Sequence, residues 1–320
     1  MQTPIQSPHQ VSVILCGYRP NPAFLKRVLD SLAHQTLPTS AWQFVVVDSA
    51  SPEPIASISG LPWPVGTRFV CAPEPGLALA RTLGCSNAAA PLIAFIDDDT
   101  VLAPDYLATA VGFLAAHPQV AAVSGRISPD FEVSPPSWIH EFNTLLALRD
   151  FGDQALISCP PTGANTLPEY PRFAPVGVNI CRREFFNRFR ENCDKHPVHF
   201  SFGRNANSLA SGEDNDFIIS IIRSGAQVAY CPELQITHII PERRLTPNYL
   251  GRLNRASSKT WLQVLLLNGI SSWPAISRWT LPLRKLRAWF SYRAWRGPRE
   301  WIRWQGACGH FEGRAAINHD

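Results

Sequence analysis

The sequence predicts an α/β protein in which a mixed, mostly parallel sheet is flanked by helices. In the first half of the chain, short apolar runs typical of buried strands alternate with segments whose apolar residues recur at helical spacing. Of the 320 residues, 45% are hydrophobic and 17% are charged, which is typical of a folded globular protein. The last part of the chain, from residue 246, is expected to be a helical extension rich in Trp and Arg.

The order of strands and helices is regular up to residue 125. Apolar runs predict buried strands at 11–16, 44–48, 69–71, 92–97 and 120–124, and helices are expected at 22–35, 76–87 and 104–116. Asn21 and Pro22 form an N-cap followed by a proline at the first helical position. Ligands bind beyond the carboxyl ends of strands in such sheets. The polar residues that follow three of these strands therefore predict a shared site.

The second half is less regular. Frequent prolines between residues 126 and 175 predict loops around one helix at about 138–149. The expected elements that follow are a strand at 176–181, a helix at 182–189, a loop-like segment at 192–211, a helix from Glu213, and short strands at 227–230 and 235–238.

Tryptophan and basic residues are concentrated near the C-terminus. Seven of the ten tryptophans lie between Trp261 and Trp304, and residues 273–304 contain eight Lys or Arg and one acid. A helix with Trp and basic side chains on its faces suits an anionic membrane surface. The alternative is an ordinary helical extension that packs its Trp residues on the rest of the protein and solvates its basic face.

The remaining composition excludes several classes of protein. The net charge of +4 is too mild to predict a nucleic-acid-binding protein. The eight cysteines include no CxxC pair, so buried thiols are expected rather than a zinc ribbon or a redox pair. The first residues form no signal-peptide apolar region, and no apolar run approaches the roughly 20 residues of a membrane span. A cytoplasmic protein is therefore expected.

Two acidic segments are the strongest chemical signals. Asp97, Asp98 and Asp99 end the apolar run from Leu92, and hard oxygen ligands at this spacing suit Mg²⁺ or Mn²⁺ shared with substrate phosphates. An Asp-rich turn is the structural alternative. The second segment, 212–216 (GEDND), supports an ionic site, although acids also favour the first turn of a helix.

Six segments, in this order along the chain, resemble the motifs of a family 2 glycosyltransferase with the GT-A fold. They are the first strand 11–18, the second strand ending at Asp48, the helix start 76–81, the DxD-like segment 95–99, the acceptor-side segment 177–185 and the ED pair 213–214. The resemblance extends over about residues 11–259. It implies a Rossmann-like domain with a donor-binding half at 1–125, an acceptor-binding and catalytic-base half at 126–245, and the helical extension at 246–320.

The resemblance implies a divalent cation, Mn²⁺ or Mg²⁺, held by Asp97 and Asp99, with Asp99 the more direct ligand. Such a cation stabilises a departing diphosphate. Asp98 is expected to cap the turn or to contact the donor ribose or sugar. Some relatives carry a third ligand at the position of His238, for which a hydrogen-bonded structural histidine is the alternative.

The resemblance identifies Asp214 as the base that removes the proton of an acceptor hydroxyl. Glu213 is expected to take part in catalysis beside it. Like-charge crowding by Glu213 and Asp216 would raise the pKa of Asp214. Asp216 is the alternative base.

Further contacts with the nucleotide-diphosphate donor are expected from the strand ends and from arginines. Asp48 suits a ribose hydroxyl or a base N–H, and Arg243 and Arg244 suit phosphate oxygens unless they lie in a solvated loop. The full set of predicted donor-binding residues is Cys16, Tyr18, Arg19, Asp48, Arg81, Asp97, Asp98, Arg243 and Arg244. Relatives often carry Thr, Asp and Asn where this chain has Gly17, Ser49 and Thr82, which leaves the choice of nucleotide open.

The expected activity is an inverting sugar transfer to a hydroxyl of a glycan or lipid-linked glycan, in polysaccharide or glycan biosynthesis. The expected location is cytoplasmic, with a possible peripheral position on the inner face of the plasma membrane. A sugar nucleotidyltransferase would need a Gly-rich basic loop after the first strand, and a dehydrogenase would need GxGxxG there; the segment 17–22 supplies neither. A non-catalytic glycan- or lipid-binding relative is a further alternative, against which the intact Asp99 and Asp214 argue.

Overall fold

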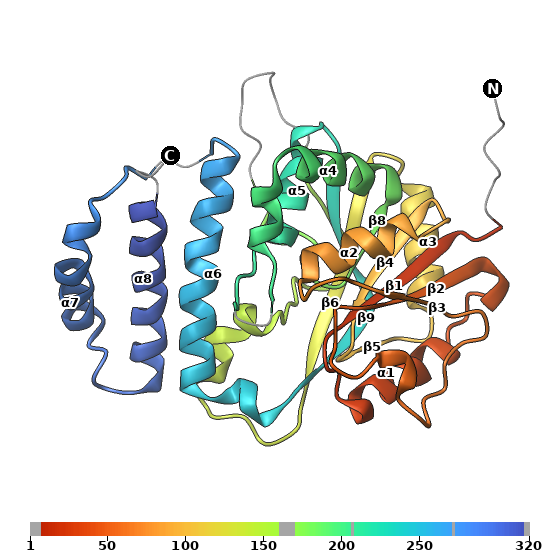
Figure 1. Ribbon diagram of the computed structural model, residues 1–320, viewed down its shortest axis with the longest axis horizontal. Helices are drawn as coiled ribbons and strands as arrows, with labels where there is room; N and C mark the ends of the chain where they lie inside the picture. Colours follow the sequence, from red (N-terminus) through yellow and green to blue (C-terminus); the bar gives the residue numbers. More distant parts are fainter. Residues whose placement is uncertain (1–7, 160–169, 206–207, 271–272, 317–320) are drawn as a thin grey trace.

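The computed structural model describes residues 8–159, 170–205, 208–270 and 273–316. Figure 1 shows a central sheet with helices on both faces and the three C-terminal helices stacked to one side. The strands are β1 (Val11–Gly17), β2 (Trp42–Asp48), β3 (Arg68–Cys71), β4 (Leu92–Asp97), β5 (Thr100–Leu102), β6 (Val120–Phe131), β7 (Leu156–Ile157), β8 (Asn179–Arg182) and β9 (Gln227–Ile240).

The α-helices are α1 (Pro22–Ala33), α2 (Leu77–Ser86), α3 (Tyr106–Ala116), α4 (Arg183–Lys195), α5 (Glu213–Arg223), α6 (Pro247–Leu267), α7 (Leu281–Tyr292) and α8 (Pro298–Ala316). Short 3₁₀ helices are η1 (Thr39–Ala41), η2 (Ile55–Ser57), η3 (Ile139–Leu146), η4 (Pro197–Phe202), η5 (Glu242–Leu245) and η6 (Arg278–Thr280). The expected α/β class, with a helical C-terminal extension, is confirmed.

The strands join in one mixed sheet in the order β3-β2-β1-β4-β8-β6-β9-β5, with β7 paired to β9. The strands β3, β2, β1 and β4 are parallel to one another, and β6 and β9 form a second parallel pair. Gly17 lies opposite Asp48, and Cys16 lies opposite Asp97. The carboxyl ends of β1, β2 and β4 therefore meet at one edge, as the sequence predicted.

The sheet buries apolar side chains on both faces. Alternate residues of β1 show this, since Val13 and Leu15 join the core covered by α1 and α3, whereas Ile14 joins the core covered by α2, α4 and α5. Nearly continuous apolar strands are typical of a sheet covered on both sides. Burial on both faces explains why the apolar runs in the sequence predicted buried strands.

Several elements differ from those expected. The strands expected at 227–230 and 235–238 form the single strand β9, which pairs with β6 over most of its length despite Pro232. A bulge near Gly125 shifts the register there, and this irregularity tolerates the proline. The helix expected at 138–149 is the 3₁₀ helix η3, and the loop expected at 192–211 begins with the end of α4 and contains η4. Of the predicted loops between 126 and 175, residues 160–169 lie outside the described part.

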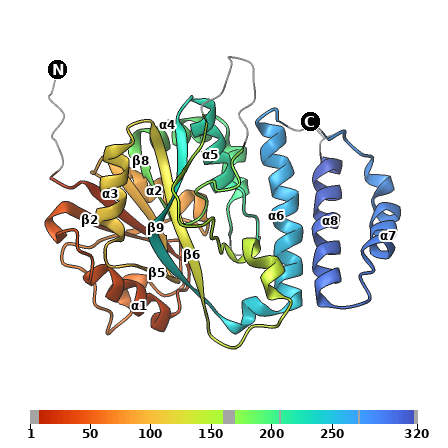
Figure 2. The ribbon, with the colours of Figure 1, turned by 180° about the vertical axis from the view of Figure 1, so that it is seen from behind.

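The C-terminal helices form successive layers, with α6 beside α5 and η3, α8 against α6, and α7 outermost (Figures 1 and 2). Leu250 and Leu253 of α6 share the core of the sheet, so the packed core continues past residue 246, where the helical extension was expected to begin. Glycines on α8 let it approach α6 closely, and a Cβ on Gly309 would lie 2.0 Å from the carbonyl oxygen of Arg255. No helix in the described ranges combines the length and the apolar character needed to cross a bilayer.

We expect Gly309→Ala to destabilise the protein by about 1–3 kcal/mol, because the new methyl group meets backbone that cannot yield without moving a helix. Gly112→Ala is the matched control. Gly112 lies on α3 with no heavy atom within 4 Å of its added Cβ, so this change should stabilise by up to about 1 kcal/mol. Thermal melting followed by circular dichroism measures both. Equal melting temperatures would contradict the close contact of α6 and α8.

Candidate active site

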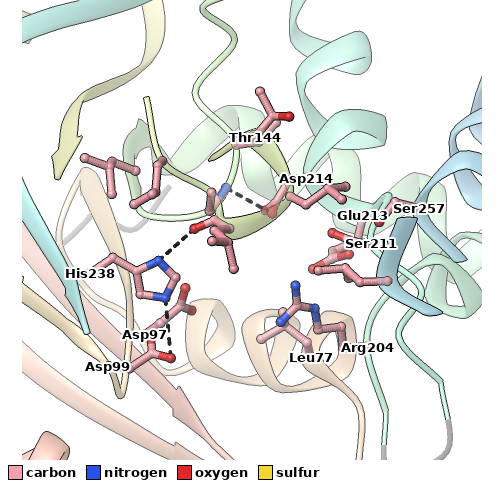
Figure 3. Close-up of a pocket in the computed structure, with 18 of the residues that line it drawn as sticks. Leu77, Asp97, Asp99, Thr144, Arg204, Ser211, Glu213, Asp214, His238 and Ser257 are labelled. Carbon is pink, nitrogen blue, oxygen red and sulfur yellow. Dashed lines mark hydrogen bonds and ion pairs between the residues drawn. The ribbon is translucent and has the colours of Figure 1, made fainter. Parts of the chain in front are cut away.

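A cavity of about 950 Å³ opens at the carboxyl ends of β1 and β4. Its walls come from the turn between β4 and β5, the start of α2, the segment after η3, the start of α5, and α6 (Figure 3). Polar side chains from elements far apart in sequence converge on it. This volume is in the range of sites that bind small molecules and cofactors.

Asp97, Asp98 and Asp99 form the turn that joins β4 to β5. The hydroxyl of Thr100 donates to Asp97 O at 2.9 Å and accepts from Asp97 N at 3.2 Å, which fixes the turn. All three acids line the cavity, and Asp99 is buried. Burial, together with the carboxylates on either side, raises the pKa of Asp98 to about 7.

His238 lies beside Asp99 because β5 and β9 pair with Thr100 opposite His238. Its Nδ1 lies 2.9 Å from Leu146 O, and since a carbonyl only accepts, Nδ1 carries the proton. The guanidinium of Arg244 donates to His238 Nε2 at 3.1 Å and contacts Asp99 Oδ2 at 2.9 Å. Although burial disfavours its charge, Arg244 and His238 hold the pKa of Asp99 below its usual range.

Arg81 of α2 connects the two acidic segments. Its side chain is 6% exposed and forms ion pairs with Asp97 at 3.9 Å, with Glu213 at 3.5 Å and, more closely, with Asp214. Burial opposes its charge, but the three acids raise the pKa of Arg81 above its usual range, so it stays protonated. The predicted donor-binding arginine therefore also binds the predicted base.

Asp214 lies in the first turn of α5 and faces the cavity. One carboxylate oxygen pairs with Arg81, and the other accepts a hydrogen bond from Gly177 N at 3.0 Å. Gly177 has a φ of 78°, a conformation that glycine adopts without strain. Burial and the neighbouring Asp214 raise the pKa of Glu213 to about 7.

Asp216, predicted as the alternative base, does not line the cavity. It is 1% exposed and binds His199 Nδ1 and Asn268 Nδ2, the latter at 2.7 Å. These partners lie on η4 and at the end of α6, so Asp216 fixes those segments to α5. Its carboxylate has no access to a substrate in the cavity, and the alternative is wrong for this reason.

The other predicted donor contacts divide into two groups. Cys16, Tyr18, Arg81 and Arg244 line the cavity, whereas Arg19, Asp48 and Arg243 do not. The two oxygens of Asp48 accept hydrogen bonds from Ser51 N at 2.8 Å and Ile55 N at 2.9 Å, which folds the loop after β2. A donor contact by Asp48 stays a prediction, since a carboxylate has further lone pairs.

The sequence reasoning missed three arginines on the cavity wall. Arg149, Arg172 and Arg204 come from irregular segments without a periodic pattern. Arg149 donates to Ala174 O at 2.8 Å and to Val176 O, and burial lowers its pKa. Tyr249, Leu253 and Ser257 of α6 were also missed, since the extension was not expected to reach the site.

The polar side chains beside the end of β4 meet only some of the requirements of a divalent-cation site. His238 Nε2 lies 3.6 Å from Asp99 Oδ2, and the guanidinium of Arg244 contacts both atoms and occupies the Nε2 lone pair. A metal ion would have to take the place of this guanidinium between the two acceptors. Across the ranges that the structure describes, no three His, Cys, Asp or Glu side chains converge as a ready metal centre.

Comparison with known protein families identifies one family. A family model described as Glycosyl transferase family 2 matches residues 12–190. Succinoglycan biosynthesis protein ExoM of Rhizobium meliloti (strain 1021) is 25% identical over 254 residues, which cover 78% of this chain and 73% of that protein. Glucosyl-dolichyl phosphate glucuronosyltransferase of Haloferax volcanii is 32% identical over 81 residues, or 24% of this chain and 26% of that protein. A crystal structure of TarS 1-349 from S. aureus aligns with a TM-score of 0.47 and 14% identity, over 94% of this chain and 89% of that one.

The raised pKa of Glu213 predicts a pH-dependent stability. Its ordinary pKa is 4.5, so between pH 4.5 and about 7 the Glu213 carboxyl is mostly ionised in the unfolded chain but mostly protonated in the folded protein. The stabilising contribution is complete below pH 4.5 and is lost as the pH rises through about 7. We therefore expect Glu213→Gln to gain stability relative to the unchanged protein over this interval.

Urea denaturation at several pH values measures this difference. Glu184→Gln is the control, because the Glu184 side chain is 59% exposed on α4. A stability difference for Glu213→Gln that is constant from acid to neutral pH would show that Glu213 titrates normally.

Proposed function

Because this chain belongs to glycosyl transferase family 2, we propose that its cavity transfers one sugar from a nucleotide-diphosphate donor to a glycan hydroxyl. The observation that carries the proposal is that one cavity holds both a group suited to a leaving diphosphate and a carboxylate suited to act as a base. Asp99 and His238 lie on one side, and Asp214 lies across from them at the start of α5 (Figure 3). Arg244 contacts both Asp99 and His238. The first group suits the leaving diphosphate and the second suits the attacking hydroxyl.

The donor diphosphate is proposed to lie against the β4–β5 turn and Arg244. A guanidinium provides paired N–H donors that match phosphate oxygens. Asp99 and His238 would hold the divalent cation, Mn²⁺ or Mg²⁺, with Asp97 beside them. When bound, such an ion acts as a Lewis acid that stabilises the charge of the departing diphosphate.

Asp214 is proposed to act as the general base. The acceptor hydroxyl attacks the anomeric carbon of the donor sugar, its proton passes to the Asp214 carboxylate, and the bond between that carbon and the phosphate oxygen breaks. The nucleoside diphosphate leaves with the bonding electrons. One in-line displacement inverts the configuration of the anomeric carbon, as the family resemblance implies.

Arg81 is proposed to hold Asp214 in place, because its guanidinium pairs with one carboxylate oxygen while Gly177 N binds the other. The same guanidinium lies 3.9 Å from Asp97, on the donor side of the cavity. Arg81 thus connects the base with the donor site through direct charge contacts.

The proposed pathway is synthesis of a surface polysaccharide or glycan, which the name of the succinoglycan biosynthesis relative supports. We propose a cytoplasmic setting with a peripheral position at the membrane. All eight cysteines are free thiols, as is usual in a reducing compartment. The membrane position is supported by the exposed surface of α7.

We expect Asp214→Asn to lower kcat by about 10²–10⁴-fold with little change in the KM for the donor, because the amide cannot accept the proton. Release of nucleoside diphosphate from a panel of nucleotide sugars, with and without glycan acceptors, measures the effect. Asp216→Asn is the control two residues away. It should lower the melting temperature but leave kcat of the folded protein within a few-fold. The proposal fails if Asp214→Asn is fully active or if Asp216→Asn loses activity while still folded.

Removal of divalent metal with a chelator should abolish donor turnover, and added Mn²⁺ or Mg²⁺ should restore it. When metal is added back to the chelated protein, Asp99→Asn and His238→Ala should raise the metal concentration needed to restore turnover by at least roughly 10–100-fold. Loss of a group that only supports a metal ligand already weakens metal binding by that factor. Glu132→Gln, on an exposed loop away from the cavity, is the control. Full activity of the chelated protein would contradict the metal assignment without affecting that of Asp214.

A further inference from the structure

A continuous apolar stripe begins at Trp279 of η6 and runs along the outer side of α7. Trp279, Leu283, Leu286 and Phe290 are 94%, 71%, 54% and 59% exposed. Their spacing of four, three and four residues places them on one side of a helix. Trp295, 55% exposed, lies just beyond the end of α7 with its ring 5.8 Å from that of Phe290. Such exposed aromatic and leucine side chains mark an interaction surface rather than a core.

The opposite side of α7 already has its packing partner. Ala288 is buried, the rings of Trp289 and Trp304 meet edge to face at 4.8 Å, and Trp304 Nε1 donates to Lys285 O. Lys285 also pairs with Glu312 of α8 at 2.6 Å. Because these contacts attach the opposite side of α7 to α8, the apolar stripe has no packing partner among the described residues.

Unpaired basic side chains surround the stripe. Arg278, Arg287, Arg293 and Arg296 are exposed, and no carboxylate of the described residues lies within 4.0 Å of them. Some basic residues of α6 and α8 are paired, since Arg255 contacts Glu312 and Arg299 contacts Glu141. The four arginines named above therefore leave uncompensated positive charge close to the exposed apolar side chains.

We propose that this face of η6 and α7, together with Trp295, docks on an anionic lipid bilayer. The apolar stripe would enter the boundary between headgroups and acyl chains, and the arginines would contact lipid phosphates. Tryptophan favours this boundary because its ring is apolar and its N–H is polar. A second copy of the chain fits the face poorly, since the four arginines would meet their own counterparts.

The docking surface is connected to the cavity by packed helices. α7 packs on α8 and α8 packs on α6, whose residues Tyr249, Leu253 and Ser257 line the cavity (Figures 1 and 2). Docking would fix the cavity at a set orientation to the bilayer, which suits an acceptor carried on a lipid. This last point rests on the proposed sugar transfer, whereas the docking itself does not.

Co-sedimentation of the full chain with vesicles tests the inference without donor or acceptor. We expect binding to phosphatidylcholine vesicles that contain phosphatidylglycerol, much weaker binding to phosphatidylcholine alone, and release by high salt. The triple variant Leu283→Ser, Leu286→Ser, Phe290→Ser should lose binding. The triple variant Arg278→Gln, Arg287→Gln, Arg296→Gln should bind roughly 100-fold more weakly.

The control replaces exposed apolar residues elsewhere, Val65→Ser and Val198→Ser, which should bind as the unchanged protein does. Circular dichroism and thermal melting establish that each variant is folded. Absence of binding to anionic vesicles, or equal binding by all variants, would overturn the proposal. So would a dimer in lipid-free solution that the serine variant converts to a monomer, since the face would then be a protein interface. None of these outcomes affects the test of Asp214.

Discussion

The active site depends on one buried positive charge. Arg81 lies among Asp97, Glu213 and Asp214, and its side chain is almost inaccessible to water. Three carboxylates brought together without it would repel one another and take up protons. A buried guanidinium without them would be equally costly. The acids that follow β4 and the acids that begin α5, proposed as the donor side and the base, can therefore lie close together only because they share this ion, which α2 supplies from between them.

The sheet positions the charges that Arg81 does not reach. The short strand β5 turns back from Asp99 and pairs with β9, and this pairing brings His238 and then Arg244 to the donor side. The expected elements included no strand at β5, yet it is the element that joins the acids of β4 to the histidine of β9. A three-residue strand has no recognisable period in the sequence, so its existence depends on the partner strand alone.

The sequence predicted those parts of the site that have both a strong local pattern and a defined place in the fold. The acids at 97–99 follow a buried strand, and Asp214 begins a helix, so their positions relative to the sheet could be inferred. The helical pattern alone could not choose between Asp214 and Asp216, because two residues on a helix point about 200° apart and only packing decides which one faces the cavity. The preference for Asp214 came from the family resemblance. The structure turns Asp216 toward His199 and Asn268. Arg149 and Arg204 were inaccessible to prediction because irregular segments give no rule for where a side chain points.

The helix α6 has consequences for how related chains can differ. Tyr249, Leu253 and Ser257 recur every four residues, so they form one stripe on the cavity wall. The other sides of the same helix contact the core of the sheet and α8. Changes within the stripe alter the shape of the cavity without disturbing the acids, Arg81 or the sheet. The shape of the molecule that the cavity admits can therefore change along this helix while the charged groups of the cavity stay the same.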